Sequence, residues 1–379
     1  MQLSSNPTPY AHWMLREIHE QPAALAATLE RYVQGHMFTP ESYTSAVTGW
    51  IMRVQAPLVI AASGSSRHAA LIAELMIEDL SGLAVDVEYA SEYIYRSDNA
   101  WPNSAVMVVS QSGETADTLA ALRKANLAGH QTLAITNVAG SSMDREATVA
   151  FPTVAGQERA IPATKSFTAQ LLNLYLLAMM RGVYGRTLHT RDFSQRLDEL
   201  ALLPRAIESQ LPAWDHAMQA MALHYRAATS FLFLGRGIHY PIAREGALKL
   251  KESAYLSAEG YPAGELKHGP NALVAKGTPL VMIATVDHAN ANSVERYDKV
   301  VHLMRDMRAQ GADIVAIANI GDTTVSSLAN HTVFVPEMRE PLLAIAEVIP
   351  LQLFAYYMAM QHGIDVDHPR NLTKAVLTE

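Results

Sequence analysis

The sequence predicts an α/β protein with two tandem domains, each built on a doubly wound parallel sheet. Short apolar runs alternate with helical segments, which is the pattern of βαβ units. The alternation occurs twice, and corresponding runs are offset by roughly 175 residues, about the size of one α/β domain. A chain of 379 residues that is 49% hydrophobic is long enough for two such cores.

Each copy of the repeat contains three units in which an apolar strand is followed by a turn and a helical segment. In the first copy these are residues 57–76, 105–125 and 131–143, and in the second copy residues 230–251, 279–305 and 312–328. Ligands of such sheets bind beyond the carboxyl ends of the strands, where the winding reverses. We therefore expect the functional loops directly after these apolar runs.

The predicted organisation has four parts: a helical segment over residues 1–43, a first domain over 44–200, a second over 201–362, and a tail over 363–379. Residues 10–55 show helical periodicity without a strand pattern, and residues 164–222 also read as helical. Two prolines interrupt the stretch from Leu203 to His216, so we place the linker between the domains there.

Composition excludes several classes of function. A formal charge of −8 and a pI near 6.0 argue against a nucleic-acid partner. The sequence has no cysteine, so disulfides and thiolate metal sites are excluded, and it has no H-E-x-x-H metal motif. The first residues lack the apolar stretch of a signal peptide. The apolar segment Pro341–Met360 contains Glu347, Pro350 and Gln352, which favours a buried helix over a membrane span. We expect a cytoplasmic protein without a membrane or metal partner.

Two loops that follow predicted strands are rich in small and hydroxyl residues. The first, "ASGSSRHAA", contains Gly64, Ser65 and Ser66, and the second, "SQSGETADT", contains Ser110, Gln111, Ser112 and Thr115 around Gly113. Neutral donors at helix N-termini suit a phosphate ester. The alternative is that these serines only cap helices and that Glu114 only interacts with a helix dipole. Neither loop has the dinucleotide or Walker A pattern.

The second domain carries different chemistry. Lys249 and Glu252 are three residues apart, so on a helix they share one face, and His268 follows in "GELKHGP". Together these groups suit proton transfer next to a carbonyl. A solvated ion pair and a structural histidine are the alternatives. In the tail "HPRNLTKAVLTE", Lys374 offers an amine for a Schiff base with a sugar carbonyl, unless the tail is a frayed end.

The motifs "SGSS", "SQSGETADT", "EGALKLKE", "GELKHGP" and "RNLTKAVLTE" closely resemble the isomerase half of glucosamine-6-phosphate synthase, which consists of two sugar isomerase (SIS) domains. The resemblance covers the chain from about Tyr10 to Glu379 and implies two tandem SIS domains with the C-terminal tail over the active site.

The resemblance also implies roles for individual residues. The phosphate-binding positions match Ser66, Ser110, Gln111, Ser112 and Thr115, while Ser65 matches a threonine that contacts the sugar. Gly64, Ala163 and Thr373 complete the expected substrate-binding set. Glu252 matches the base that moves a proton between C1 and C2, Lys249 its assisting amine, and Lys374 the Schiff-base lysine. His268 matches a ring-opening residue that the family supplies from the partner subunit, which implies a homodimer.

The sequence departs from the synthase in two respects. It contains neither the glutaminase domain nor a cysteine, so we expect no glutamine hydrolysis. In "GQERAIPATKSFT", Ala163 replaces a serine that contacts the sugar in the synthase, and this form looks more like the SIS deaminases of amino-sugar phosphates.

These features predict an enzyme without a cofactor, a phosphosugar aldose–ketose isomerase and deaminase. It would interconvert glucosamine 6-phosphate and fructose 6-phosphate plus free ammonia, mainly towards deamination. One alternative is the aminating direction, with ammonia or a separate glutaminase. Others are a related substrate, such as galactosamine 6-phosphate or a fructosamine phosphate, and a non-catalytic sensor of sugar phosphates.

Overall fold

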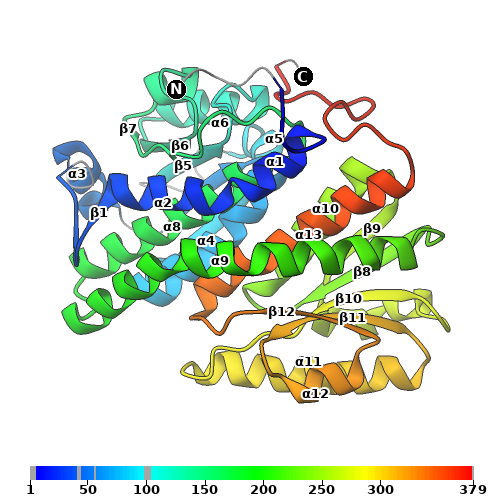
Figure 1. Ribbon diagram of the computed structural model, residues 1–379. Coiled ribbons are helices and arrows are strands. Elements are labelled where there is room, and N and C mark those ends of the chain that lie inside the picture. Colours follow the sequence, from blue (N-terminus) through cyan, green and yellow to red (C-terminus); the bar gives the residue numbers. More distant parts are fainter. Residues whose placement is uncertain (1–5, 41–43, 55–56, 98–103, 378–379) are drawn as a thin grey trace. The chain divides into compact units, whose positions relative to one another are not determined.

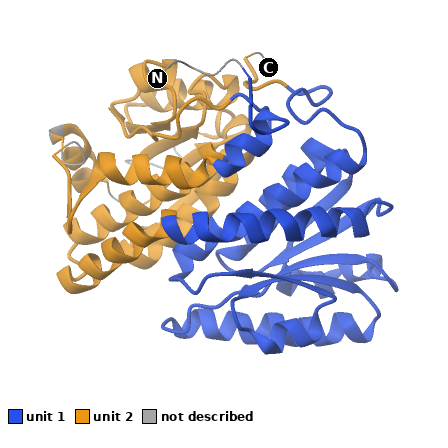
Figure 2. Ribbon diagram, in the orientation of Figure 1, with its two compact units in different colours: residues 1–19, 159–164, 205–372 blue, residues 20–158, 165–204, 373–379 orange. Residues whose placement is uncertain are grey.

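The computed structural model describes residues 6–40, 44–54, 57–97 and 104–377, which form two compact units. Unit 1 comprises residues 1–19, 159–164 and 205–372, and unit 2 comprises residues 20–158, 165–204 and 373–379 (Figure 2). Each unit is therefore assembled from segments that are far apart in the sequence, and the last residues of the chain belong to the unit that contains the first repeat.

Unit 2 contains the first repeat (Figure 1). Its helices are α2 (Gln21–Tyr32), α3 (Ser45–Arg53), α4 (Gly64–Ser81), α5 (Ala90–Tyr93), α6 (Ala116–Leu127), α7 (Ser142–Glu146), α8 (Lys165–Tyr184) and the first part of α9 (Thr190–His224). Its strands are β1 (Val33–Gln34), β2 (Met37–Phe38), β3 (Leu58–Ala62), β4 (Val85–Tyr89), β5 (Ala105–Ser110), β6 (Gln131–Thr136) and β7 (Val149–Ala150).

Unit 1 contains the second repeat and the end of α9. Its other helices are α1 (Trp13–His19), α10 (His239–Ala254), α11 (Ala291–Ala309), α12 (Thr323–Leu328), α13 (Glu340–Gln361) and the 3₁₀ turns η1 (Ala263–His268) and η2 (Pro270–Leu273). Its strands are β8 (Ser230–Gly235), β9 (Ser257–Pro262), β10 (Pro279–Ile283), β11 (Asp313–Asn319) and β12 (His331–Val335).

The two units have the same sheet topology. The order is β4-β3-β5-β6-β7 in unit 2 and β9-β8-β10-β11-β12 in unit 1, and all neighbouring strands in these two sheets are parallel. In both sheets the chain starts at the second position, adds one strand on one side and then crosses to the other. The winding therefore reverses between β3 and β5 in unit 2, and between β8 and β10 in unit 1.

Helices cover both faces of each sheet. In unit 1, α11 and α12 lie on one face, and α10 and α13 lie on the other (Figure 1). In unit 2, α5, α6 and α7 pack on one face, while α4 packs against α8 on the other. Central strands such as β5 are buried along their whole length, because both faces are covered.

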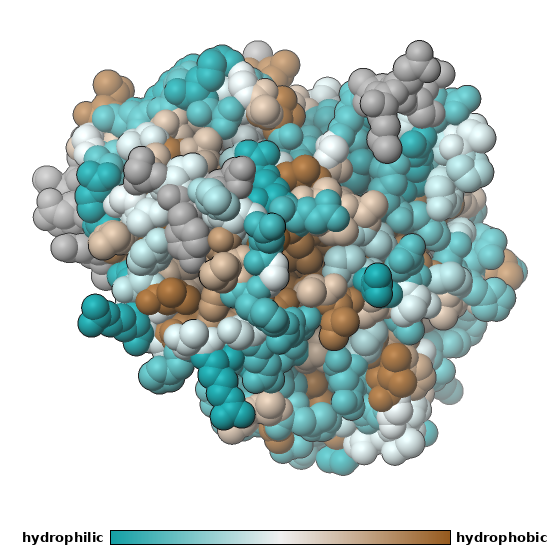
Figure 3. Space-filling view, turned by 60° about the vertical axis from the view of Figure 1, so that its left-hand side comes forward, coloured by the Kyte–Doolittle hydropathy of each residue, from teal (hydrophilic) through white to brown (hydrophobic). Residues whose placement is uncertain are grey.

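Helix α13 is buried as the sequence predicts. Among the described residues it is the one helix whose length and mean hydropathy of 1.6 would suffice for a membrane span, but 94% of its most apolar window is buried within the protein. That burial is the pattern of a core helix. The face drawn in Figure 3 mixes hydrophilic residues with separate groups of hydrophobic ones.

The predicted fold class is confirmed, with three differences in detail. The helix interruption predicted between Leu203 and His216 is wrong, because α9 runs through this stretch and holds Pro204 and Pro212 within the helix, but the boundary between the units does fall there, after Pro204. The region predicted as purely helical before residue 55 contains the short antiparallel pair β1 and β2. The outer strands β4, β7, β9 and β12 were not among the predicted repeats.

Candidate active site

The loop after β3 lies at the winding reversal of unit 2, as the sequence predicts. Helix α4 begins at Gly64, whose φ of +54° is the left-handed conformation that glycine adopts easily, so Ser65 and Ser66 lie in its first turn. Gln170 of α8 donates a hydrogen bond from Nε2 to Ser66 Oγ at 3.0 Å. Ser66 is therefore oriented by a side chain of the neighbouring helix.

The loop after β5 lies beside the first loop, because β3 and β5 are adjacent. Ser110 Oγ accepts the Gly113 N–H at 3.2 Å and lies 3.2 Å from Thr115 Oγ1, while Ser112 Oγ accepts the Glu114 N–H at 3.1 Å. These bonds curl the loop around the N-terminus of α6. The serine hydroxyl oxygens thus accept hydrogen bonds from two backbone N–H groups of the loop. The same hydroxyl groups are gathered in one place, where they can serve as neutral donors.

Gly113 is required by the packing of this loop. Its φ is +67°, and a Cβ at this position would lie 2.1 Å from Ser141 Oγ. A side chain therefore cannot be added without moving the segment that starts α7. Glu114 has a structural partner as well, since its Oε1 accepts the Ser142 N–H at 2.7 Å. This bond supports a structural role for Glu114, at the N-terminus of α7.

The C-terminal tail joins unit 2 at two points. Lys374 Nζ donates to Glu158 Oε2 at 2.6 Å, and the Ala116 N–H donates to the Val376 carbonyl at 2.9 Å. Ala116 is the first residue of α6, directly after the second loop. Thr373 is exposed, and its Oγ1 donates to the Ala375 carbonyl at 3.0 Å. The tail is thus held, rather than frayed, next to the predicted phosphate loops.

Helix α8 connects the first loop with the tail. Glu158 accepts hydrogen bonds from Ser166 Oγ at 2.7 Å and from the Ser166 N–H at 3.1 Å. Ser166 and Gln170 are four residues apart on α8 and therefore share one face. From this face, Gln170 positions Ser66 directly, and Ser166 positions Lys374 through Glu158. The same helix therefore links the first loop of unit 2 with the C-terminal tail.

In unit 1, Lys249 and Glu252 form a close ion pair on α10. Lys249 Nζ lies 2.5 Å from Glu252 Oε2 and 3.4 Å from Glu245 Oε1. The lysine and Glu245 side chains are 1% and 0% exposed, whereas that of Glu252 is 22% exposed. This is a buried cluster rather than the solvated pair considered above, and Glu252 is its partly exposed member.

The other two predicted residues of unit 1 lie elsewhere. His268 ends η1 with an exposed side chain, and within the described residues no hydrogen bond or ion pair connects it to Lys249 or Glu252. Ala163 lies in the segment 159–164 and is half-buried. The structure thus brings Lys249 and Glu252 together but does not bring His268 to them within this chain.

Sequence reasoning missed several residues of these clusters. Glu245 stands four residues before Lys249, a spacing that already indicates contact on a helix. No comparable spacing in the sequence indicates the contacts of Glu158 and Gln170. Glu158 comes from an irregular segment, and its lysine partner is 216 residues away in the sequence.

A second buried ionic cluster lies at the winding reversal of unit 1. His239, the first residue of α10, lies 3.0 Å from Glu347 and 3.2 Å from Glu340, and Arg296 also pairs with Glu340 at 2.5 Å. Burial alone would lower the pKa of His239, but the two carboxylates raise it to about 9. Burial would raise the pKa of Glu340, but His239 and Arg296 lower it to about 2. This cluster joins the start of α10 to α13.

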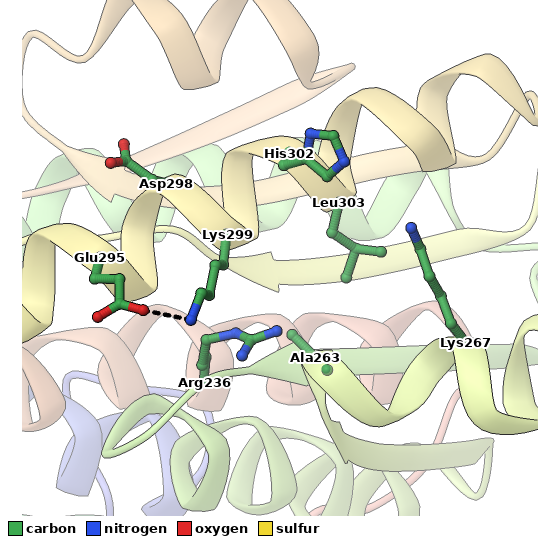
Figure 4. Close-up of a pocket in the computed structure, with 9 residues that line it drawn as sticks. Arg236, Ala263, Lys267, Glu295, Asp298, Lys299, His302 and Leu303 are labelled. Carbon is green, nitrogen blue, oxygen red and sulfur yellow. Dashed lines mark hydrogen bonds and ion pairs between the residues drawn. The ribbon is translucent and has the colours of Figure 1, made fainter.

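A cavity of about 370 Å³ in unit 1 is separate from these clusters (Figure 4). Arg236 after β8, Lys267 of η1 and Lys299 of α11 line it, and none of the predicted site residues does. Lys267 pairs with Asp306, and Lys299 pairs with Glu295, so these cations already have partners. In the described ranges no group of three or more His, Cys, Asp or Glu side chains is arranged to hold a metal ion.

The duplicated sheet and its loops define the class of the protein. The family model for the SIS domain matches residues 51–180 and 224–361, one match in each repeat, so the chain belongs to the SIS family. The match confirms the tandem SIS domains that the motifs led us to expect.

Individual relatives place the chain more narrowly. It is 38% identical over 371 residues to the glutamine–fructose-6-phosphate aminotransferase (isomerizing) of Caldanaerobacter subterraneus, covering 98% of this chain and 59% of the relative. The chain thus spans about three fifths of the length of this curated relative. The solved C-terminal domain of glucosamine-fructose-6-phosphate aminotransferase from Francisella tularensis is 32% identical, with a TM-score of 0.89 over 96% of this chain and all of that one. The expected homology to the isomerase half is confirmed.

A more distant structure shares the fold. The glucosamine-6-phosphate deaminase of Thermotoga maritima has a TM-score of 0.69 at 22% identity, covering 96% of this chain and 99% of that one.

Proposed function

We propose that this chain is a phosphosugar aldose–ketose isomerase that converts glucosamine 6-phosphate into fructose 6-phosphate and free ammonia. The observation that carries the proposal is the cluster on α10, where a buried lysine holds the partly exposed Glu252. A carboxylate placed in this way is suited to move a proton between adjacent carbons. Two of the relatives described above are named as fructose-6-phosphate aminotransferases, so their names share the proposed product.

Unit 2 would bind the phosphate group of the substrate. Ser110, Ser112 and Thr115 gather hydroxyl groups around the N-terminus of α6, and Ser66 adds one from the neighbouring loop. Helix N-termini favour anions, because their first N–H groups lack partners within the helix. Ser65, Gln111 and Gly64 complete this loop pair, and Ala163 and Thr373 are assigned to the sugar.

Unit 1 would supply the proton transfer. In the open-chain amino sugar, Glu252 takes the proton from C2 and returns it to C1, which turns the amine at C2 into an imine. Water then adds to the imine, and ammonia leaves, so the products are the ketose and ammonia. Lys249 neutralises the charge of Glu252 within the buried cluster. Through the family resemblance, Lys374 is assigned the Schiff base with the keto sugar.

The ring-opening step is assigned to His268 of the partner subunit, which requires a homodimer. In this chain His268 is exposed, and within the described residues it has no hydrogen-bond partner, so it is available to a second subunit. The direction is assigned by mass action. When no glutaminase delivers ammonia, ammonia released from the site is diluted into water, and deamination is favoured.

The test is to incubate the purified protein with glucosamine 6-phosphate and to measure ammonia and fructose 6-phosphate. We expect both products in equal amounts, and no release at any pH would overturn the proposal. The reverse assay, with fructose 6-phosphate and high ammonia, measures the aminating direction. The same assay with galactosamine 6-phosphate and a fructosamine phosphate measures the choice of substrate, which rests on few hydrogen bonds. Binding of these sugars without turnover would instead support a sensor.

A further inference from the structure

Glu158 is a buried carboxylate that forms an ion pair with Lys374. Its side chain is 0% exposed, and it accepts from the Ser166 side chain and backbone and from Lys374 Nζ. The lysine side chain is 26% exposed. A buried carboxylate is stabilised only when its charge is paired and its oxygens accept hydrogen bonds, and this site meets both conditions. The two serine bonds fix the carboxylate, so its position does not depend on the tail.

The pair matters because a lysine can attack a carbonyl only as a neutral amine. The overall step is ammonium plus ketone to iminium plus water. The ammonium first gives up a proton, the free Nζ forms a bond to the carbonyl carbon, and the carbinolamine later loses its hydroxyl as water and so takes a proton up. A group close to Nζ must therefore accept a proton before the amine attacks and must return it when the hydroxyl leaves as water. Glu158 Oε2, 2.6 Å from Nζ, is at hydrogen-bonding distance for this.

We propose that Glu158 is the residue that holds Lys374 in place and accepts and returns its proton. The inference rests on the proposed function, because it concerns the reaction of Lys374 with a keto sugar phosphate. The Glu158 carboxylate also pairs with the cationic iminium. It therefore faces one positive charge at Nζ both before and after Nζ bonds to the carbonyl carbon. Ser166 has a positioning role, because it fixes the Glu158 carboxylate.

The first experiment needs no substrate. Wild-type protein and E158Q are acetylated with limiting acetic anhydride, and the modification of Lys374 is compared by peptide mass spectrometry with that of the exposed Lys276. In the wild type we expect Lys374 to react about tenfold more slowly than Lys276, because its Nζ is engaged in a charge-assisted hydrogen bond with the Glu158 carboxylate. In E158Q the difference should disappear. E146Q, which breaks the exposed pair with Arg123, is the matched control and should behave as wild type.

The second experiment traps the imine. Fructose 6-phosphate and borohydride are added, and the mass increase on Lys374 is followed with time. Wild type and E146Q should trap the sugar, E158Q at least about tenfold more slowly, and E158D at an intermediate rate because it keeps the carboxylate at a greater distance. E158D also serves if E158Q fails to fold, since it should show intermediate values in both experiments.

The outcomes separate the two proposals. If the wild type traps no sugar, the assigned role of Lys374 is wrong, whatever Glu158 does. If the wild type traps the sugar and E158Q does so at the same rate, the role of Glu158 is overturned and that of Lys374 stands. Equal acetylation of Lys374 in wild type and E158Q would also overturn the role of Glu158.

Discussion

Lys249 Nζ lies 2.5 Å from Glu252 Oε2, yet the lysine is almost fully buried and the glutamate is 22% exposed. Both are carried by α10, three residues apart, so they point from one face of the helix. Glu245 lies on the other side of the lysine. The pair therefore has a buried member and a partly exposed member, and the partly exposed Glu252 is the base in the proposed reaction.

Replacing Glu252 with glutamine should abolish turnover and preserve binding. The amide keeps the shape of the side chain but cannot accept a proton, and a positioned base contributes about 10²- to 10⁴-fold to a rate. We expect kcat to fall by at least about 10²-fold, with the Kd for glucosamine 6-phosphate within a few-fold of wild type. Turnover and equilibrium binding are the measurements, and wild-type turnover in E252Q would refute the assignment of the base.

Lys249→Met should destabilise the protein. It removes the buried cation that pairs with Glu245 and Glu252, and breaking a buried ion pair typically costs about 3–5 kcal/mol. Lys276→Met is the matched control, because Lys276 is exposed. Urea unfolding of both variants measures the effect. A Lys249→Met variant as stable as its control would show that the cluster contributes little.

Gly113→Ala should distort the loop after β5 that is proposed to bind phosphate. The new Cβ would lie 2.1 Å from Ser141 Oγ, in addition to the strain of a positive φ. Gly129→Ala separates these causes, since Gly129 has a φ of +80° but nothing within 4 Å of a Cβ. We expect Gly113→Ala to weaken binding of inorganic phosphate at least about tenfold, and Gly129→Ala to lose only about 1 kcal/mol of stability. Phosphate titration and thermal unfolding test this, and equal effects of the two would contradict it.

The stability of the protein should fall at alkaline pH because of His239. Its pKa is raised from 6.5 to about 9 in the folded state by Glu347 and Glu340, which outweigh burial. The stabilisation that protonated His239 gives the folded protein is therefore complete below pH 6.5 and is lost as the pH rises through about 9. Arg296 pairs with Glu340, and the Asp287 carboxylate accepts the Glu340 N–H, so both groups face the same cluster. Unfolding free energies of wild type and His239→Gln from pH 6 to 10 check this, and identical slopes would disprove it.

Much of the fold could be predicted because the central strands are short apolar runs buried on both faces. The apolar run that ends at Ser110 is an example. The outer strands were missed because they are short or carry polar residues, as in the "SAEGYP" of β9. The predicted break in the helix between Leu203 and His216 is wrong, because a proline usually interrupts a helix but α9 accommodates both Pro204 and Pro212.

The site could be predicted only where spacing or local pattern reports on geometry. The hydroxyl loops follow directly after strands, and Lys249 and Glu252 stand at helical spacing, so both were accessible to sequence reasoning. Partner residues that come from irregular segments could not be predicted from the sequence. Nothing local indicates that Glu158 meets Lys374 or that the Ala116 N–H meets the Val376 carbonyl, because tertiary folding creates these contacts.

The ion pair between Glu158 and Lys374 also bears on when the chain becomes competent to react. It closes a loop of 216 residues, and joining the ends of a flexible chain of that length would cost about 5 kcal/mol in entropy. One ion pair cannot offset this cost in an unfolded chain. The pair therefore forms after the intervening residues have folded. Partly folded or newly synthesised chains accordingly lack the arrangement of Glu158 and Lys374 on which the proposed Schiff-base step depends.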